Sequence, residues 1–188
     1  GFPVPNKQDL FGAIIGLPYD TEQITDAHVV AEDAAGNIGK APFGMIFKKV
    51  NFKFDKINVS DGFLDLKIPE FSQYYPEMTG SPLDKYLYVN NTVRIANNRR
   101  IAEICSKSVP EQFWQGRFER MDRSSTRAGY ADHRTYYYNG QEVDKQVHLG
   151  IDLASTQRAK VAAANRGKVI FAEYLGIYGN MVIIDYGL

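Results

Sequence analysis

The sequence predicts a mainly β fold with one helical segment. Apolar and polar residues alternate with a period of two in several short stretches, which is typical of half-buried strands. One stretch, beginning at Ser81, instead has apolar residues at helical spacing. Of the 188 residues, 44% are hydrophobic and 13% are aromatic, so the chain can bury a core. We therefore expect one domain or two small ones.

Residues 1–68 are expected to be β-rich. The stretch T-D-A-H-V-V-A-E-D-A-A-G-N-I-G (25–39) contains a short strand that runs into an acidic turn with two glycines. The D-A-A-G-N turn resembles the end of a bacterial immunoglobulin-like domain. We therefore expect an immunoglobulin-like β part at the beginning of this chain.

A β-hairpin is predicted at the end of this part, over residues 48–68. Apolar residues alternate with polar ones on both sides of Asp61-Gly62, a dipeptide that is common in tight turns. In the second strand of this hairpin, Leu64 and Leu66 would lie on the same face.

Residues 69–110 are expected to form a linker and the helix. Ser81 is a residue type that caps helix N-termini, Pro82 suits the first helical position, and an acidic residue follows in the first turn. The helix should end before Pro110. Its N-N-R-R stretch (97–100) is interpreted as a solvated face.

The last part, residues 111–188, returns to β structure. Candidate strands are 113–118, 135–140, which runs into an Asn-Gly turn, and 167–174 and 180–187, which flank a glycine-rich loop.

The composition excludes several functional classes. Lys and Arg together number 22, as do Asp and Glu, so net charge gives no argument for nucleic acid as a partner. The sequence contains no run of eighteen apolar residues, so it predicts no transmembrane helix. Cys105 is the one cysteine, which excludes an intrachain disulfide, and we expect it to be a small core residue.

The stretch V-H-L-G-I-D-L-A (147–154) has the alternation of a strand, yet it holds two potential metal ligands, His148 and Asp152. In a straight strand, residues four apart lie about 13 Å from each other, whereas zinc needs its donor atoms about 2 Å from the ion. The two residues could share an ion only if the chain bends between them, and Gly150 stands at the midpoint. On spacing alone, two ordinary surface residues are the simpler interpretation.

Four motifs occur in a fixed order over roughly the last sixty residues. They are G-Y-A-D-H-R-T-Y-Y-Y-N-G (129–140), V-H-L-G-I-D-L-A (147–154), K-V-A-A-A-N-R-G-K-V-I-F-A (160–172) and G-I-Y-G-N-M-V-I-I-D-Y-G (176–187). This ordered set resembles the lysostaphin/LytM-type zinc metalloendopeptidases of bacterial cell walls. The resemblance implies an incomplete antiparallel β peptidase domain over 111–188. The helix before it resembles the spacer sometimes found ahead of such domains.

The resemblance also implies roles for individual residues. His148 and Asp152 correspond to the first two zinc ligands of the family. The third ligand is the last histidine of an H-x-H motif, and the first histidine of that motif and another in a Y-x-H motif assist catalysis. No histidine follows His148 in this sequence, so no catalytic residue is assigned within it. We expect a truncated peptidase domain that is inactive alone.

A substrate groove is expected near the paired residues. His133, Tyr136 and Tyr138 are its candidate lining, and His133 could also be a substitute ligand. The alternative for His133 is a structural, hydrogen-bonded role. If Tyr136 and Tyr138 face outward, Tyr137 packs in the core.

The function that the resemblance implies is cleavage of peptide cross-links in bacterial peptidoglycan, with zinc as cofactor and a location in the periplasm or cell envelope. The expected partners are peptidoglycan peptides, and the missing C-terminal part or a second chain could contact the site. The alternative is a non-catalytic cell-wall-binding regulator that activates other wall hydrolases. A third interpretation, an immunoglobulin-like adhesion module, leaves the motifs after 129 unexplained.

Overall fold

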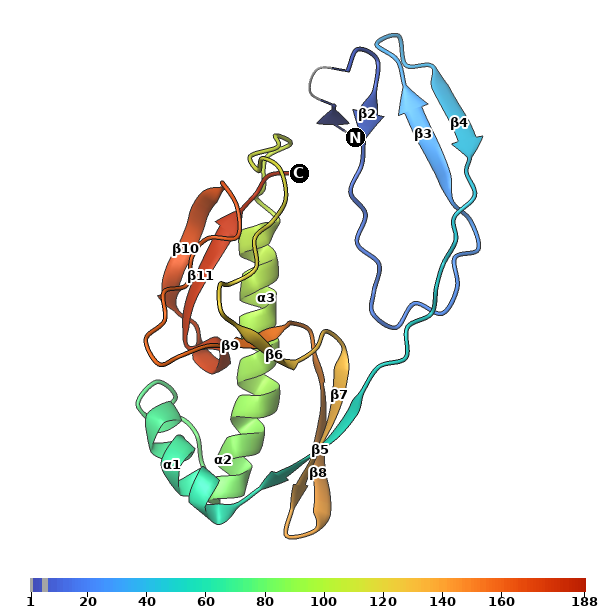
Figure 1. The fold of residues 1–188 in the computed structure, drawn as a ribbon. Helices are drawn as coiled ribbons and strands as arrows, with labels where there is room; N and C mark the ends of the chain where they lie inside the picture. The colour runs from blue at the N-terminus through green and yellow to red at the C-terminus, as the bar shows by residue number, and fades with distance from the viewer. Residues whose placement is uncertain (1, 5–6) are drawn as a thin grey trace.

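The computed structural model describes residues 2–4 and 7–188, and its strands form several small sheets around one long helical rod (Figure 1). The mainly β class that the sequence predicts is confirmed. The first strands are β1 (Phe2–Pro3), β2 (Phe11–Gly12), β3 (His28–Glu32), β4 (Ile38–Pro42) and β5 (Phe54–Val59). The helical elements that follow are α1 (Asp61–Ser72), α2 (Pro82–Tyr88), the π-helical turn η1 (Val89–Val93) and α3 (Arg94–Cys105). The remaining elements are β6 (Ser125–Ala128), β7 (Asp132–Tyr138), β8 (Gln141–His148), β9 (Asp152–Ala154), β10 (Lys168–Tyr174), the 3-10 turn η2 (Gly176–Tyr178) and β11 (Asn180–Asp185).

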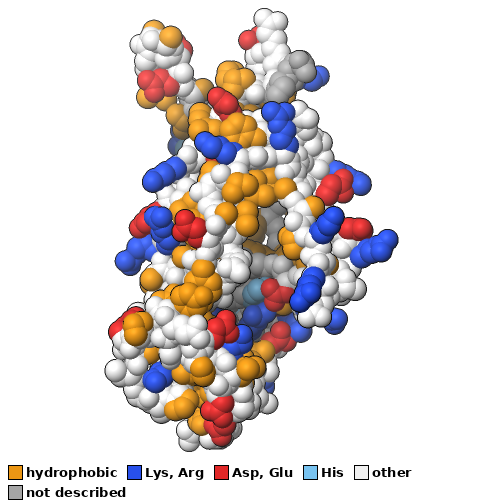
Figure 2. Space-filling view, turned by 90° about the vertical axis from the view of Figure 1, so that its left-hand side faces the viewer, with side chains coloured by type: hydrophobic (Ala, Val, Ile, Leu, Met, Phe, Trp, Pro, Cys, Tyr) orange, Lys and Arg blue, Asp and Glu red, His pale blue; other side chains and the backbone are white. Residues whose placement is uncertain are grey.

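The N-terminal strands form an arm beside the rest of the molecule (Figure 1). β3 and β4 pair antiparallel around the predicted acidic turn, in which the Asp33 carboxylate accepts backbone N–H groups from Ala35 and Asn37 at 2.9 Å each. The whole molecule exposes 14270 Å², whereas a compact chain of this mass exposes about 9,000 Å². Many apolar side chains therefore lie open on its surface (Figure 2). The immunoglobulin-like character of this part stays a prediction.

The predicted hairpin over 48–68 is wrong in its second half, which forms helix α1. Ser60 caps this helix, because its Oγ accepts a backbone N–H of the first turn at 3.2 Å. Leu64 and Ile68 are buried one helical turn apart, and Leu66 between them is exposed. The sheet gives the reason: β5 pairs in parallel with β7, and a parallel pair needs a long crossover in place of a tight turn.

The long helical rod begins and ends as predicted. The Ser81 Oγ accepts the backbone N–H of Asp84 at 3.2 Å, and the Asp84 carboxylate accepts the backbone N–H of Ser81 at 2.9 Å. This reciprocal cap lowers the pKa of Asp84, because Ser81 donates hydrogen bonds to its charged form. The rod runs through α2, η1 and α3 to Cys105, before Pro110.

One face of the rod differs from the prediction. Asn97 belongs to the stretch interpreted as solvated, but it is buried, and its Oδ1 accepts the backbone N–H of Ile177 at 3.1 Å. The glycine-rich loop packs there, and this fixes the β10–β11 ribbon against the rod. Cys105 is exposed and is not the core residue that we expected.

The core lies between the rod and its neighbours. One cluster joins α1, α2, β5 and β7 through Val59, Leu64, Ile68, Tyr86 and Tyr136. A second cluster contains Met78, Val89 and Val93, against which Ile177 of η2 packs. The rod is thereby held between the β5–β7–β8 sheet and the β10–β11 ribbon (Figure 1).

Most of the predicted strands after residue 111 are confirmed. β7 runs into the turn at Asn139-Gly140, and β10 and β11 flank the glycine-rich loop. The stretch 113–118 is not a strand, because the Asn165 side chain takes up the backbone groups that a ladder would use. In the part of the chain that the structure describes, no helix is long and apolar enough to cross a membrane.

The helical assignment of 61–72 can be tested with two leucines that a strand would place on the same face. Leu64 is 1% exposed and Leu66 is 72% exposed. We predict that Leu64→Ala lowers the free energy of unfolding by about 2–5 kcal/mol, because it leaves a cavity in the core. Leu66→Ala should change it by less than about 0.5 kcal/mol. Chemical denaturation measures both, and equal losses would contradict the helix.

Candidate metal site at the bend of a hairpin

The candidate site lies at a corner in one long β-hairpin. β7 pairs antiparallel with β8, and β6 pairs antiparallel with β9, so both arms of the hairpin continue past a break. The two breaks, at 129–131 and 149–151, lie opposite each other. His148 is the last residue of β8 and Asp152 is the first of β9. The bend that a shared ion requires is therefore present.

Backbone and carboxylate contacts hold the corner. Ala131 is fully buried with a φ of 62°, a left-handed conformation that is uncommon outside glycine. Its N–H donates to the carbonyl oxygen of His148 at 2.7 Å. The carboxylate of Asp132, itself buried, accepts the N–H of Gly129 at 2.8 Å. These bonds fix the backbone of His148 at the turn.

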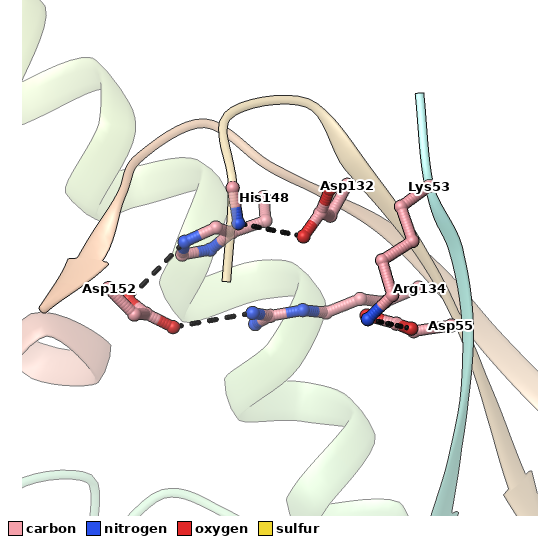
Figure 3. A network of polar contacts seen from close by, with 7 residues as sticks. Lys53, Asp55, Asp132, Arg134, His148 and Asp152 are labelled. Atoms are coloured by element: carbon pink, nitrogen blue, oxygen red, sulfur yellow. Dashed lines mark hydrogen bonds and ion pairs between the residues drawn. The ribbon is translucent and has the colours of Figure 1, made fainter. Parts of the chain in front are cut away.

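The corner brings the two predicted ligands together. The Nε2 of His148 lies 3.3 Å from the Oδ1 of Asp152 (Figure 3). This Nε2 is buried, and among the described residues it has no hydrogen-bond partner. Two donor atoms about 2.0 Å from a tetrahedral zinc are separated by about 3.3 Å. The spacing and the unpartnered nitrogen both fit two ligands of one zinc ion.

A third side chain holds the carboxylate from its other side. Arg134 on β7 donates from its Nη2 to the Oδ2 of Asp152 at 3.4 Å (Figure 3). Arg134 lies opposite Gln146 in the β7–β8 ladder, so it shares a face with His148. The arginine engages one oxygen and leaves Oδ1 directed toward the imidazole. The sequence did not predict this role, although Arg134 stands within the 129–140 motif.

The pair is not a complete metal centre. Within residues 2–4 and 7–188, no three His, Cys, Asp or Glu residues are placed to hold a metal ion together. A catalytic zinc site takes three protein ligands. The described residues thus offer two candidate ligands at this corner, His148 and Asp152.

The sequence suggested that the bend uses the conformational freedom of glycine at position 150, but the structure does not require it. Its φ lies outside the left-handed region, and a Cβ built on it would meet its nearest atoms, those of the His148 ring, at 3.8 Å. The strained position of the corner is Ala131, on the opposite arm.

His133 faces away from His148 and Asp152. It pairs with Phe54 of β5, and their rings stack at a centroid distance of 4.9 Å, with Tyr19 edge-on at 5.9 Å. Neighbouring residues of a strand point to opposite faces, so His133 and Arg134 project on opposite sides of β7. The idea of His133 as a substitute ligand is therefore wrong. It does contribute to the wall of the large open cavity that contains His148.

The three tyrosines of β7 lie on the opposite faces of the strand from those that the sequence predicts. Tyr136 is 8% exposed and packs on Tyr86 in the core, so its predicted place in the groove is wrong. Tyr138 also packs on the core and does not line the cavity; its hydroxyl donates to Asp61 at 2.7 Å, which raises the pKa of Tyr138. Tyr137, expected in the core, lies beneath the ammonium group of Lys56. The helices α1 and α2 decide which face of β7 is buried.

Two glycines allow the origin of the bend to be tested. We predict that Gly150→Ala changes the free energy of unfolding by less than about 1 kcal/mol, since neither φ nor space opposes a side chain. Gly176→Ala should lower it by more than about 2 kcal/mol, because φ is 45° and the new Cβ would overlap Asn97 and Tyr75. Thermal unfolding compares the two variants, and a large loss for Gly150→Ala would show that the bend requires glycine.

Comparison with known proteins identifies part of the chain. No curated protein that was compared matches it. The model of Peptidase family M23 matches residues 146–188. This stretch contains the His148–Asp152 pair and the β10–β11 ribbon. The lysostaphin/LytM-type resemblance is thereby confirmed over residues 146–188, which are similar to part of Peptidase family M23.

Proposed function

We propose that this chain is part of a zinc metalloendopeptidase that cleaves peptide cross-links of bacterial peptidoglycan. The observation that supports this most is the 3.3 Å separation of His148 Nε2 and Asp152 Oδ1 within the segment that matches peptidase family M23. Because peptidoglycan lies outside the cytoplasm, the proposed location is the periplasm or cell envelope.

Each residue of the site has a defined task in this proposal. His148 binds zinc through the unpartnered Nε2, which requires a neutral imidazole, and Asp152 binds through Oδ1. Arg134 holds Oδ2 and so orients the carboxylate, as outer-shell partners of metal ligands do. When bound, zinc supplies a Lewis acid that polarises the scissile carbonyl. The site needs a third ligand, which the described residues do not supply at this corner.

Zinc binding should depend on all three side chains, to different degrees. In a zinc titration against a chromophoric chelator, we expect about one zinc ion per molecule of the longest natural form of the protein that contains these residues. His148→Ala and Asp152→Ala should abolish binding, because each removes a ligand. Arg134→Gln should weaken binding by about 10- to 100-fold, because the carboxylate loses its fixed orientation.

His133→Ala is the matched control for this titration, since His133 lies on the opposite face of the strand. It should leave zinc affinity unchanged. Zinc binding that survives His148→Ala, or that is lost in His133→Ala, would contradict the assigned ligands.

Hydrolysis is tested on purified, cross-linked peptidoglycan with the longest natural form of the protein that contains these residues. We expect zinc-dependent release of free amino groups, which a chelator stops and Asp152→Ala abolishes. Undiminished release by Asp152→Ala would refute the proposal. Binding to peptidoglycan without release, in a folded protein that holds no zinc, would instead favour the non-catalytic regulator.

A further inference from the structure

We infer that Arg94 forms a subsite beside His148 and Asp152 that binds a carboxylate of the substrate. The inference rests on the proposed function, because it assigns the substrate's charged group to the groove that contains His148 and Asp152. Arg94 lies on the helical rod, outside the segment that matches peptidase family M23.

The groove is large and has walls from both the hairpin and the rod. Its volume is about 930 Å³. His148, Asp152 and Arg134 form one side of it, and Arg94, Asn98 and Tyr178 form another. The Tyr178 hydroxyl donates to Asn98 at 2.6 Å, which joins the glycine-rich loop to the rod. Figure 2 shows a histidine inside a hollow of the surface, with acidic and basic side chains next to it.

The charges that line this groove are mainly positive. Its cations are Arg94, Arg134 and Lys145, and its one acidic residue is Asp152. Arg134 is paired with Asp152, and Lys145 is paired with Glu142 at 2.8 Å. Among the described residues, no carboxylate forms an ion pair with Arg94. The groove therefore contains one half-buried cation that lacks a direct acidic partner, and such a cation favours an anionic ligand.

Arg94 is held in place by neutral groups. Its Nε donates to the backbone oxygen of Asn90 at 3.0 Å, and its Nη2 donates to the side-chain oxygen of the same residue. Asn90 is 4% exposed and donates in turn to Asp144. Asp144 forms no direct ion pair with the arginine; its Oδ2 accepts hydrogen bonds from the side-chain amides of Asn90 and Gln146. The guanidinium is thus preorganised, with Nη1 still free to donate.

Asn90 also connects Arg94 to the strand that carries His148. Gln146 donates from its side chain to the backbone oxygen of Asn90 at 3.2 Å. Gln146 and His148 are two residues apart on β8, so they share a face and lie about 6.6 Å apart. A peptide that reaches the ligand pair can therefore place a nearby carboxylate at Arg94. The acceptable ligands are a C-terminal carboxylate or an acidic side chain close to the scissile bond.

Binding of three acetylated tetrapeptides to the longest natural form of the protein that contains these residues tests this subsite. The probes are tetraalanine as the free acid, tetraalanine as the carboxamide, and Ala-Glu-Ala-Ala as the carboxamide. We expect at least one carboxylate peptide to bind about tenfold more tightly than the tetraalanine carboxamide, and to shift the Arg94 Nε–H resonance in NMR spectra. Which peptide does so distinguishes a terminal from a side-chain carboxylate.

Variants separate Arg94 from general basicity. Arg94→Gln should abolish the preference for the carboxylate, and Arg94→Lys should retain part of it, since it keeps the charge but not the fork of donors. Arg99→Gln removes an exposed arginine of the same helix that does not line the groove, and should change nothing. If Arg94→Gln does not fold, two measurements still show whether Arg94 binds the carboxylate. They are the comparison of Arg94→Lys with the unmodified protein and the shift of the Arg94 resonance.

Zinc content, measured on the same samples, separates this inference from the proposed function. Equal binding of acid and amide peptides overturns the carboxylate subsite, whether or not zinc is bound. A carboxylate preference that depends on Arg94, in a chain that binds no zinc, supports the subsite and counts against the peptidase.

Discussion

The hydrogen bond from the Ala131 N–H to the His148 carbonyl is the contact on which the site depends. It joins the two arms of the hairpin where both are interrupted, and it holds Ala131 in a left-handed conformation. Without the corner, the strand would separate His148 and Asp152 by about 13 Å. With it, their donor atoms are 3.3 Å apart. A backbone constraint on one arm thus creates a pair of side chains on the other.

The helical rod gives this corner its surroundings. Tyr86 and Tyr136 pack one face of β7 against the rod, and the same face continues to Arg134. Further along the rod, the π-helical turn directs Asn90 toward β8, where its backbone oxygen accepts a hydrogen bond from Gln146. The same oxygen accepts a hydrogen bond from Arg94, on the next turn of the rod. A π-helical turn within an α-helix is often found at a functional site. The rod therefore serves as a wall of the groove as well as a support for the sheet.

Charge is distributed unevenly along that groove. Asp152 has its second oxygen occupied by Arg134, so the carboxylate is oriented and also partly neutralised. Arg94 has only neutral partners. A bound zinc ion would add to the positive charge, which makes an anionic group of the substrate the natural complement of this surface. The proposed metal site and the proposed carboxylate subsite thus share one groove.

The sequence by itself determined the features that depend on local chemistry. Ser81 and Pro82 define the start of the rod, Asn139-Gly140 makes the hairpin turn, and the ordered motifs after 129 carry the family resemblance that is confirmed over 146–188. Local alternation could not distinguish helix from strand at Leu64, because residues 64 and 68 share a face in both. The parallel pairing of β5 with β7 decided that question.

Tertiary structure alone decided the site's geometry. Which tyrosine of β7 is buried depends on where α1 and α2 pack, and the sequence of the strand does not contain that information. The strain at Ala131 and the roles of Arg134 and Arg94 likewise arise from partners distant in sequence. The family resemblance identified His148 and Asp152 as candidates, but only the paired breaks of the two arms bring them together, because a bend is a property of the hairpin as a whole.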